Sequence, residues 1–209
     1  MVTKEQILQW LQAVAVVLEK NKEYLTELDA AIGDADHGIN MNRGFQKVIT
    51  QLPSVVDKDI GSILKTVSMT LISSVGGASG PLYGTLFLKA STVVAGKEEL
   101  SSEDMVALLQ AGVDGVVQRG KANLGDKTML DALSPAADAF KEAIANGQTT
   151  VEALQQAVSA AEQGMKDTIP LVAKKGRASY LGDRSANHPD PGATSSYLIL
   201  KTLVETVSS

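Results

Sequence analysis

The chain contains no cysteine among its 209 residues. Disulfide bonds, thiolate metal sites and cysteine nucleophiles are therefore excluded. Only two histidines are present, His37 and His188. No arrangement around them resembles the nucleophile, base and orienting group of a hydrolase. A catalytic base or a phospho-acceptor is a possible role for either histidine, but no sequence pattern assigns one.

Long apolar runs and an excess of positive charge are also missing. No apolar stretch approaches the roughly 20 residues that cross a bilayer, and the N-terminal MVTKEQILQW lacks the pattern of a signal peptide. The net charge is −5 and the isoelectric point is about 5.1, whereas nucleic acids and anionic membranes require a basic face. We therefore expect a cytoplasmic protein that has neither nucleic acid nor a membrane as its partner.

Hydrophobic residues make up 44% of the chain and recur at helical spacing along most of it. In the first segment they run from Ile7 to Leu18, and polar residues lie between them. No segment alternates like a convincing strand. The sequence predicts one all-α domain over residues 1–209, with the first helix followed by seven more at about 39–52, 58–75, 81–96, 102–119, 128–146, 150–173 and 192–207.

The connections between these eight helices fall into two kinds. Those after the second, fourth and sixth helices are short and plain. Those after the first, third, fifth and seventh are rich in glycine, charge and hydroxyl groups: LDAAIGDADHG, GGASGP, RGKANLGDKT and KGRASYLGDRSANHPDPG. Because short connections make neighbouring helices antiparallel, all four rich loops are expected at one end of an up-and-down bundle. The polar chemistry is therefore predicted at that end.

The first rich loop brings together three aspartates, Asp29, Asp34 and Asp36. Their mutual repulsion, on the order of 1 kcal/mol or more for each close pair, favours a bound cation. Oxygen ligands favour a hard ion, and the residues that follow Asp34 do not fit a calcium-binding EF-hand loop. Magnesium shared with a phosphorylated ligand is the better interpretation. A solvated acidic turn with helix-capping aspartates is the alternative.

Other rich loops offer groups that suit phosphate. The segments His37–Asn40 and Ala78–Gly80 open predicted helices, whose free N–H groups and dipoles favour anions. Arg177 supplies a cation, although a basic residue near a helix C-terminus also compensates the helix dipole. The segment GKANLGDKT is not a P-loop, because Asp126 separates the glycine from the lysine and no strand precedes it. These loops together predict a phosphate-binding end.

Four motifs carry a resemblance to a known family: LDAAIGDADHGINMNRG, SVGGASGPLYG, RGKANLGDKTMLD and KGRASYLGDRS followed by DPGA. They resemble the nucleotide-binding subunits of dihydroxyacetone kinases, and the similarity runs from near the N-terminus to the last helix. It implies an eight-helix antiparallel barrel that binds ADP or ATP at one end. It also implies that Asp29, Asp34 and Asp36 hold two Mg²⁺ ions. The nucleotide-binding residues implied by the resemblance are His37, Gly38, Ile39, Asn40, Ala78, Ser79, Gly120, Met129, Arg177, Asp190, Pro191 and Gly192.

The resemblance further implies how such a chain works. Dihydroxyacetone would be held on a separate kinase subunit and receive phosphate from the nucleotide bound here. In the phosphoenolpyruvate-dependent version, a phosphohistidine-bearing subunit of the phosphotransferase system recharges the bound ADP. We expect this version, because 209 residues leave no room for a ketone-binding domain. The alternatives are a kinase subunit that exchanges free ATP and a regulatory module that senses Mg-ADP and acts on a transcription regulator.

Overall fold

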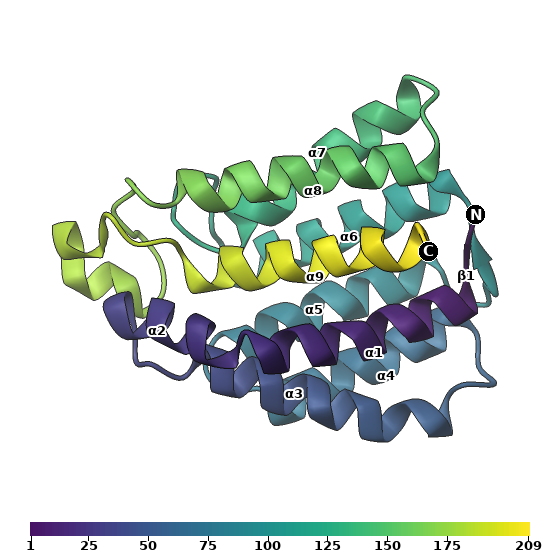
Figure 1. Cartoon of the computed structure of the whole chain (residues 1–209), viewed down its shortest axis with the longest axis horizontal. Helices are drawn as coiled ribbons and strands as arrows, with labels where there is room; N and C mark the ends of the chain where they lie inside the picture. The colour runs from purple at the N-terminus through teal and green to yellow at the C-terminus, as the bar shows by residue number, and fades with distance from the viewer.

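The computed structural model describes residues 1–209 and consists almost entirely of helices (Figure 1). The all-α prediction is confirmed. The nine α-helices are α1 (Lys4–Lys20), α2 (Lys22–Ile32), α3 (His37–Gln51), α4 (Ile60–Ser74), α5 (Ser79–Val93), α6 (Ser102–Gly120), α7 (Leu130–Ala145), α8 (Thr150–Asp167) and α9 (Pro191–Val207). Two 3₁₀ segments, η1 (Leu52–Ser54) and η2 (Arg177–Ser185), complete the helical structure. No helix is long and apolar enough to span a bilayer.

Eight of these helices close into a ring. Each of α3 to α8 packs against the next helix in the chain, α9 packs against α8, and α1 closes the ring between α9 and α3. The helix α2 lies outside this ring and packs against α3 and α9. The predicted eight-helix barrel is therefore present, with its first helix divided into α1 and α2.

The break between α1 and α2 is a correction to the prediction of one continuous first helix. Asn21 separates the two, and its side-chain Nδ2 donates to the carbonyl of Val17 at 2.8 Å. Asparagine competes in this way with the regular helical hydrogen bonds. Helix α2 continues to Ile32, so Asp29 lies on a helix and not in the predicted loop.

Two further differences separate the prediction from the structure. A short antiparallel ribbon pairs β1 (Val2–Thr3) with β2 (Glu99–Leu100), and two residues are too few to produce a periodic signal. Helix α8 ends at Asp167 instead of near residue 173. The reason is Pro170, because the residues before a proline are disfavoured in helical conformation.

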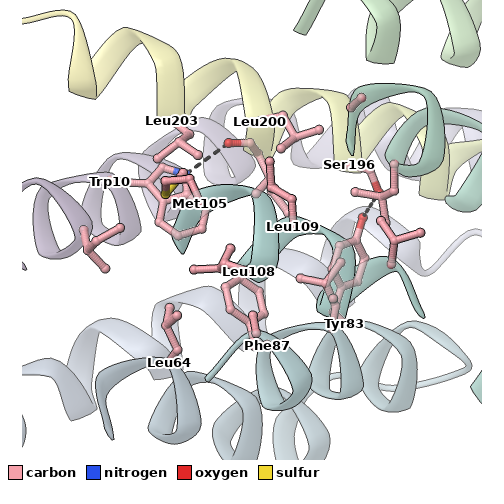
Figure 2. Close-up of a pocket in the computed structure, with 18 residues that line it drawn as sticks. Trp10, Leu64, Tyr83, Phe87, Met105, Leu108, Leu109, Ser196, Leu200 and Leu203 are labelled. Atoms are coloured by element: carbon pink, nitrogen blue, oxygen red, sulfur yellow. Dashed lines mark hydrogen bonds between the residues drawn. The ribbon is translucent and has the colours of Figure 1, made fainter. Parts of the chain in front are cut away.

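The barrel interior is a packed apolar core. Phe87 lies between Trp10 and Phe45, with ring centroids 6.0 and 6.3 Å apart. A cavity of only about 60 Å³ remains, and nearly all of its lining residues are hydrophobic (Figure 2). The polar tips at its wall are satisfied: Trp10 Nε1 donates to the Ile199 carbonyl at 3.0 Å. The interior stabilises the barrel and offers no group that could carry phosphoryl chemistry.

Candidate functional site

A much larger cleft, of about 380 Å³, opens at one end of the barrel. Its walls come from the α2–α3, α4–α5 and α6–α7 connections and from the segment between α8 and α9. Figure 1 shows these connections at the end opposite to the two chain termini. The prediction that the glycine-rich and charged loops gather at one end is confirmed.

The three predicted metal ligands meet on one wall of this cleft. Asp29, Asp34 and Asp36 each place a carboxylate oxygen within 4.8 Å of the others. Asp29 is buried, Asp34 is exposed and Asp36 is half-buried, so the group is open on the side of the cleft. Hard oxygen donors in an open arrangement suit Mg²⁺, which keeps waters and substrate oxygens among its ligands. The donor set therefore fits the magnesium that the sequence predicts.

The backbone around the triad is shaped to hold Asp29. Its Oδ2 accepts the N–H groups of Asp36 at 2.8 Å and His37 at 3.0 Å. Gly33 lies against the same carboxylate, since a Cβ atom there would sit 2.1 Å from Asp29 Oδ1. Ala35 has a φ of 60°, which is strained for a residue other than glycine. The loop is thus folded around the carboxylate of Asp29, while the carboxylates of Asp34 and Asp36 accept no backbone N–H group.

Helix capping differs between the two ends of the barrel. At the far end, side chains cap the first turns of four helices, namely α1, α4, α6 and α8, by Thr3, Asp59, Ser101 and Thr149. At the cleft end, Asp190 caps α9, the first N–H of α3 donates to Asp29, and the first N–H of α7 donates to Thr128 Oγ1. No side chain caps α5. An uncapped N-terminus leaves donor N–H groups and the positive end of the helix dipole for an anion. The start of α5 therefore favours phosphate binding at the cleft.

His37 connects the start of α3 to the other walls of the cleft. Its Nδ1 lies 3.1 Å from Ser79 Oγ on α5, and its Nε2 lies 2.9 Å from Ser195 Oγ on α9. Ser195 Oγ in turn lies 2.7 Å from the buried hydroxyl of Tyr83. Burial lowers the pKa of His37 to about 4, against the opposing effect of Asp29. A neutral imidazole therefore orients Ser79 without adding charge.

A second buried group lies at the start of α9. Asp190 caps this helix, and its Oδ2 accepts the N–H of Ala193 at 2.7 Å. Burial raises the pKa of Asp190 to about 7, and the nearby Asp131 adds to the increase while Lys127 opposes it. The carboxyl of Asp131 accepts the N–H groups of Gly125 and Thr128 at 2.6 and 2.7 Å. Asp131 therefore holds the loop before α7 on the first turn of that helix, and Asp190 does the same for the start of α9.

Most of the residues predicted for nucleotide binding line the cleft. They are His37, Ala78, Ser79, Gly120, Met129, Arg177, Asp190, Pro191 and Gly192, and the three aspartates join them. Gly38, Ile39 and Asn40 do not line it. A Cβ on Gly38 would lie 2.0 Å from the Lys22 carbonyl, so this glycine allows α2 and α3 to pack closely. Ile39 is exposed, and Asn40 Oδ1 accepts from Arg43.

Several cleft residues were absent from the sequence prediction. Gly76 and Gly77 belong to the glycine motif SVGGASGPLYG, which is the sequence signal for them. Lys127 belongs to the segment GKANLGDKT, which does not match a P-loop and so gives no signal for this lysine. Tyr83 also belongs to that glycine motif and lines the cleft, but its contact with Ser195 on α9 joins residues far apart in the sequence, and no local pattern signals it.

Comparison with known proteins agrees with this geometry. The DAK2 domain matches residues 31–205. The chain is 48% identical, over 96% of both chains, to the ADP-binding subunit DhaL of the PEP-dependent dihydroxyacetone kinase of Escherichia coli. It is 40% identical, over the full length of both, to the ADP-binding subunit DhaL of the PTS-dependent dihydroxyacetone kinase of Lactococcus lactis.

A solved structure gives the same result for the fold. The dihydroxyacetone kinase of C. freundii in complex with AMP-PNP and Mg²⁺ superposes with a TM-score of 0.70 at 25% identity. The match covers 94% of this chain and 33% of that chain. With the domain matched over most of its length and relatives that align from end to end, this chain belongs to the DAK2 domain family of dihydroxyacetone kinases.

Proposed function

We propose that this chain is the ADP-binding subunit of a phosphoenolpyruvate-dependent dihydroxyacetone kinase. The observation that carries the proposal is one cleft lined both by the carboxylates of Asp29, Asp34 and Asp36 and by the uncapped start of α5. A phosphate chain bridged by magnesium satisfies both, because the metal binds the carboxylates while the phosphate oxygens accept the free N–H groups. The relatives that align over their whole length carry names of this subunit.

Asp29, Asp34 and Asp36 would hold the metal, and we propose two Mg²⁺ ions there. Three carboxylates beside a diphosphate bring more negative charge than one divalent ion neutralises. When bound, magnesium supplies charge neutralisation and alignment of the phosphate oxygens. Arg177 adds a positive charge at the same wall, since its Nε lies 2.8 Å from Asp34 Oδ2.

The protein's own groups position the nucleotide in this proposal. The start of α5, with Ala78 and Ser79, donates N–H and hydroxyl groups to phosphate oxygens. Leu82, Val116 and Met129 line the same cleft and provide an apolar wall for the nucleoside. Phosphoryl transfer needs positioning and charge stabilisation more than covalent chemistry from the protein. This division of roles matches the residues in the cleft.

The phosphoryl acceptor would come from a second protein. A triose offers few atoms for binding, at best about 1.5 kcal/mol for each non-hydrogen atom, so a subunit that fixes dihydroxyacetone is physically reasonable. We propose a dihydroxyacetone-binding kinase subunit as one partner and a phosphohistidine-bearing phosphotransferase subunit as the other, in the cytoplasm. Exchange with free ATP and regulation through a transcription regulator are the alternatives, and both use the same cleft.

Two measurements test the nucleotide assignment. Mass spectrometry of gently purified protein should detect retained ADP, and calorimetry should show that Mg-ADP binds the stripped protein at one site. Binding equal in EDTA would contradict the metal assignment. Absence of any nucleotide binding would contradict the proposal as a whole. A phosphotransfer assay with the partner subunits separates a transferase from a regulatory module.

A further inference from the structure

The side chain of Lys127 is buried beneath the cleft, with only 1% of the residue exposed. Its ammonium group donates to three main-chain carbonyls: Ile169 at 3.4 Å, Leu171 at 3.0 Å and His188 at 2.6 Å. An ammonium carries three N–H groups, so all of its donors are used by the backbone. Burial of a charged ammonium costs free energy unless the group is fully hydrogen-bonded. The complete set of hydrogen bonds at Lys127 therefore indicates a specific role.

The three carbonyls belong to both ends of one segment, residues 168–190, which we call the arm. The arm leaves α8, contains η2 and returns to the start of α9. Its two ends also bind each other, since the N–H of Asn187 donates to Ile169 at 2.7 Å and the N–H of Asp190 donates to Thr168 Oγ1 at 2.9 Å. Lys127 connects these paired ends to the loop between α6 and α7.

The arm carries groups that the proposed function needs. Arg177 lies near its middle and contacts Asp34, and Asp190 at its end caps the helix that begins with Pro191 and Gly192. All of these residues line the cleft. A change where the two ends of the arm meet should therefore move both Arg177 and the start of α9, which line the cleft.

The backbone conformation of Lys127 recurs at a second lysine in the same loop, which provides a matched control. The φ of Lys127 is 64°, in the left-handed region where glycine is preferred. Lys121 in the same loop has a φ of 50°, but its side chain is exposed and makes no hydrogen bond or ion pair. The two lysines share a backbone conformation and differ in what their ammonium groups contact.

We propose that Lys127 is a positioning residue for the cleft, which acts by holding both ends of the arm through backbone carbonyls. The nucleotide part of this inference rests on the proposed function, whereas the ordering of the arm does not. Loss of the ammonium should loosen the arm and weaken nucleotide binding while the barrel helices remain folded.

The matched pair Lys127→Gly and Lys121→Gly tests this. Each change relieves the same backbone strain, so Lys121→Gly should melt at or above the wild-type temperature. In Lys127→Gly, amide hydrogen exchange at Asn187 and Asp190 should accelerate at least tenfold while exchange in α4 stays at the wild-type rate. The dissociation constant for Mg-ADP, measured per folded molecule, should rise at least tenfold in Lys127→Gly and remain unchanged in Lys121→Gly.

Other outcomes would overturn the inference. If Lys127→Gly shows wild-type amide hydrogen exchange and wild-type affinity for Mg-ADP, Lys127 does not hold the arm. If exchange accelerates equally in all helices while affinity per folded molecule is unchanged, Lys127 stabilises the fold in general and positions nothing. If Lys127→Gly does not fold, Lys127→Met, which retains the apolar stem, takes its place with the same expectations. If wild-type protein binds no Mg-ADP, the proposed function fails, and the exchange comparison still decides the role of Lys127.

Discussion

Arg177 Nε donates to Asp34 Oδ2 across 2.8 Å and thereby connects the arm to the acidic loop before α3. Both side chains are partly open to solvent, at 71% and 37% exposure. An ion pair of this kind contributes at most about 1 kcal/mol to stability. Its consequence is mainly one of position, because it keeps a guanidinium beside the carboxylates and at the mouth of the cleft.

Replacement of Arg177 by glutamine should therefore separate binding from stability. The free energy of unfolding without ligand should change by less than about 1 kcal/mol, since the pair is exposed. The affinity for Mg-ADP should fall by about 1.5–3 kcal/mol, the range for hydrogen bonds to charged groups. Calorimetry and thermal melts measure the two effects, and Arg184→Gln on the same arm is the control. If Arg177→Gln lost as much free energy of unfolding as free energy of Mg-ADP binding, a direct contact between Arg177 and the ligand would be contradicted.

Replacement of Asp34 or Asp36 by asparagine removes a charged metal ligand. We expect Mg-ADP binding to weaken by about 2–4 kcal/mol, because magnesium binds carboxylates far better than amides. The metal-free protein should be as stable as the wild type or slightly more so, because repulsion within the triad is reduced. The exposed Asp138 on α7 makes no side-chain hydrogen bond or ion pair, so Asp138→Asn is the matched control. Unchanged affinity in both triad variants would reject the metal assignment.

Two buried groups should make the free energy of unfolding depend on pH in opposite directions. The pKa of Asp190 is raised by burial to about 7, so between about pH 4 and 7 the folded protein holds a proton that the unfolded chain has lost. The stabilising contribution of protonated Asp190 is therefore lost as pH rises from about 4 to 7. The pKa of His37 is lowered by burial to about 4, so its contribution is present above about pH 6.5 and is lost as pH falls. The two slopes oppose each other, and each is at most about 1.4 kcal/mol per pH unit.

Single variants should reveal each slope in metal-free buffer. Asp190→Asn keeps a helix-capping side chain, and between pH 4 and 7 its stability relative to the wild type should rise with pH. The relative stability of His37→Gln should fall with pH over the same range. Denaturant unfolding at several pH values measures both. Parallel curves for the wild type and either variant would show that the replaced group does not titrate as its burial requires.

Periodic apolar residues and the alternation of plain and rich loops lead directly to an antiparallel helical bundle with one functional end, whereas closure into a barrel is implied only by the resemblance to dihydroxyacetone kinase subunits. The break at Asn21 does not follow from these local signals, because it involves one residue with a non-helical backbone inside an otherwise periodic segment. The orientation of Gly38 toward α2 depends on how two helices pack, and no residue type reveals it. The contacts of Lys127 with Ile169 and His188 join segments more than 40 residues apart, so they appear only in three dimensions.

Ligand binding should stabilise the protein through the cleft loops. Mg-ADP at about 100 times its dissociation constant should add roughly 2.7 kcal/mol to the free energy of unfolding, because the ligand binds only the folded state. Excess EDTA should abolish the gain, since the carboxylates then repel the phosphates. Chemical unfolding with ADP alone, magnesium alone and both together distinguishes the contributions. A gain that persists in EDTA would mean that the helix N-termini bind the phosphates without metal.

The central claim is that this chain holds the nucleotide and a second subunit holds the ketone. Purified chain is mixed with ATP, Mg²⁺ and dihydroxyacetone, and triose phosphate is followed with and without the dihydroxyacetone-binding subunit. The account predicts product only when both proteins are present, and loss of that product when Asp36→Asn replaces the wild-type chain. Comparable turnover by the isolated chain would contradict the account, because it would require a ketone site within these 209 residues.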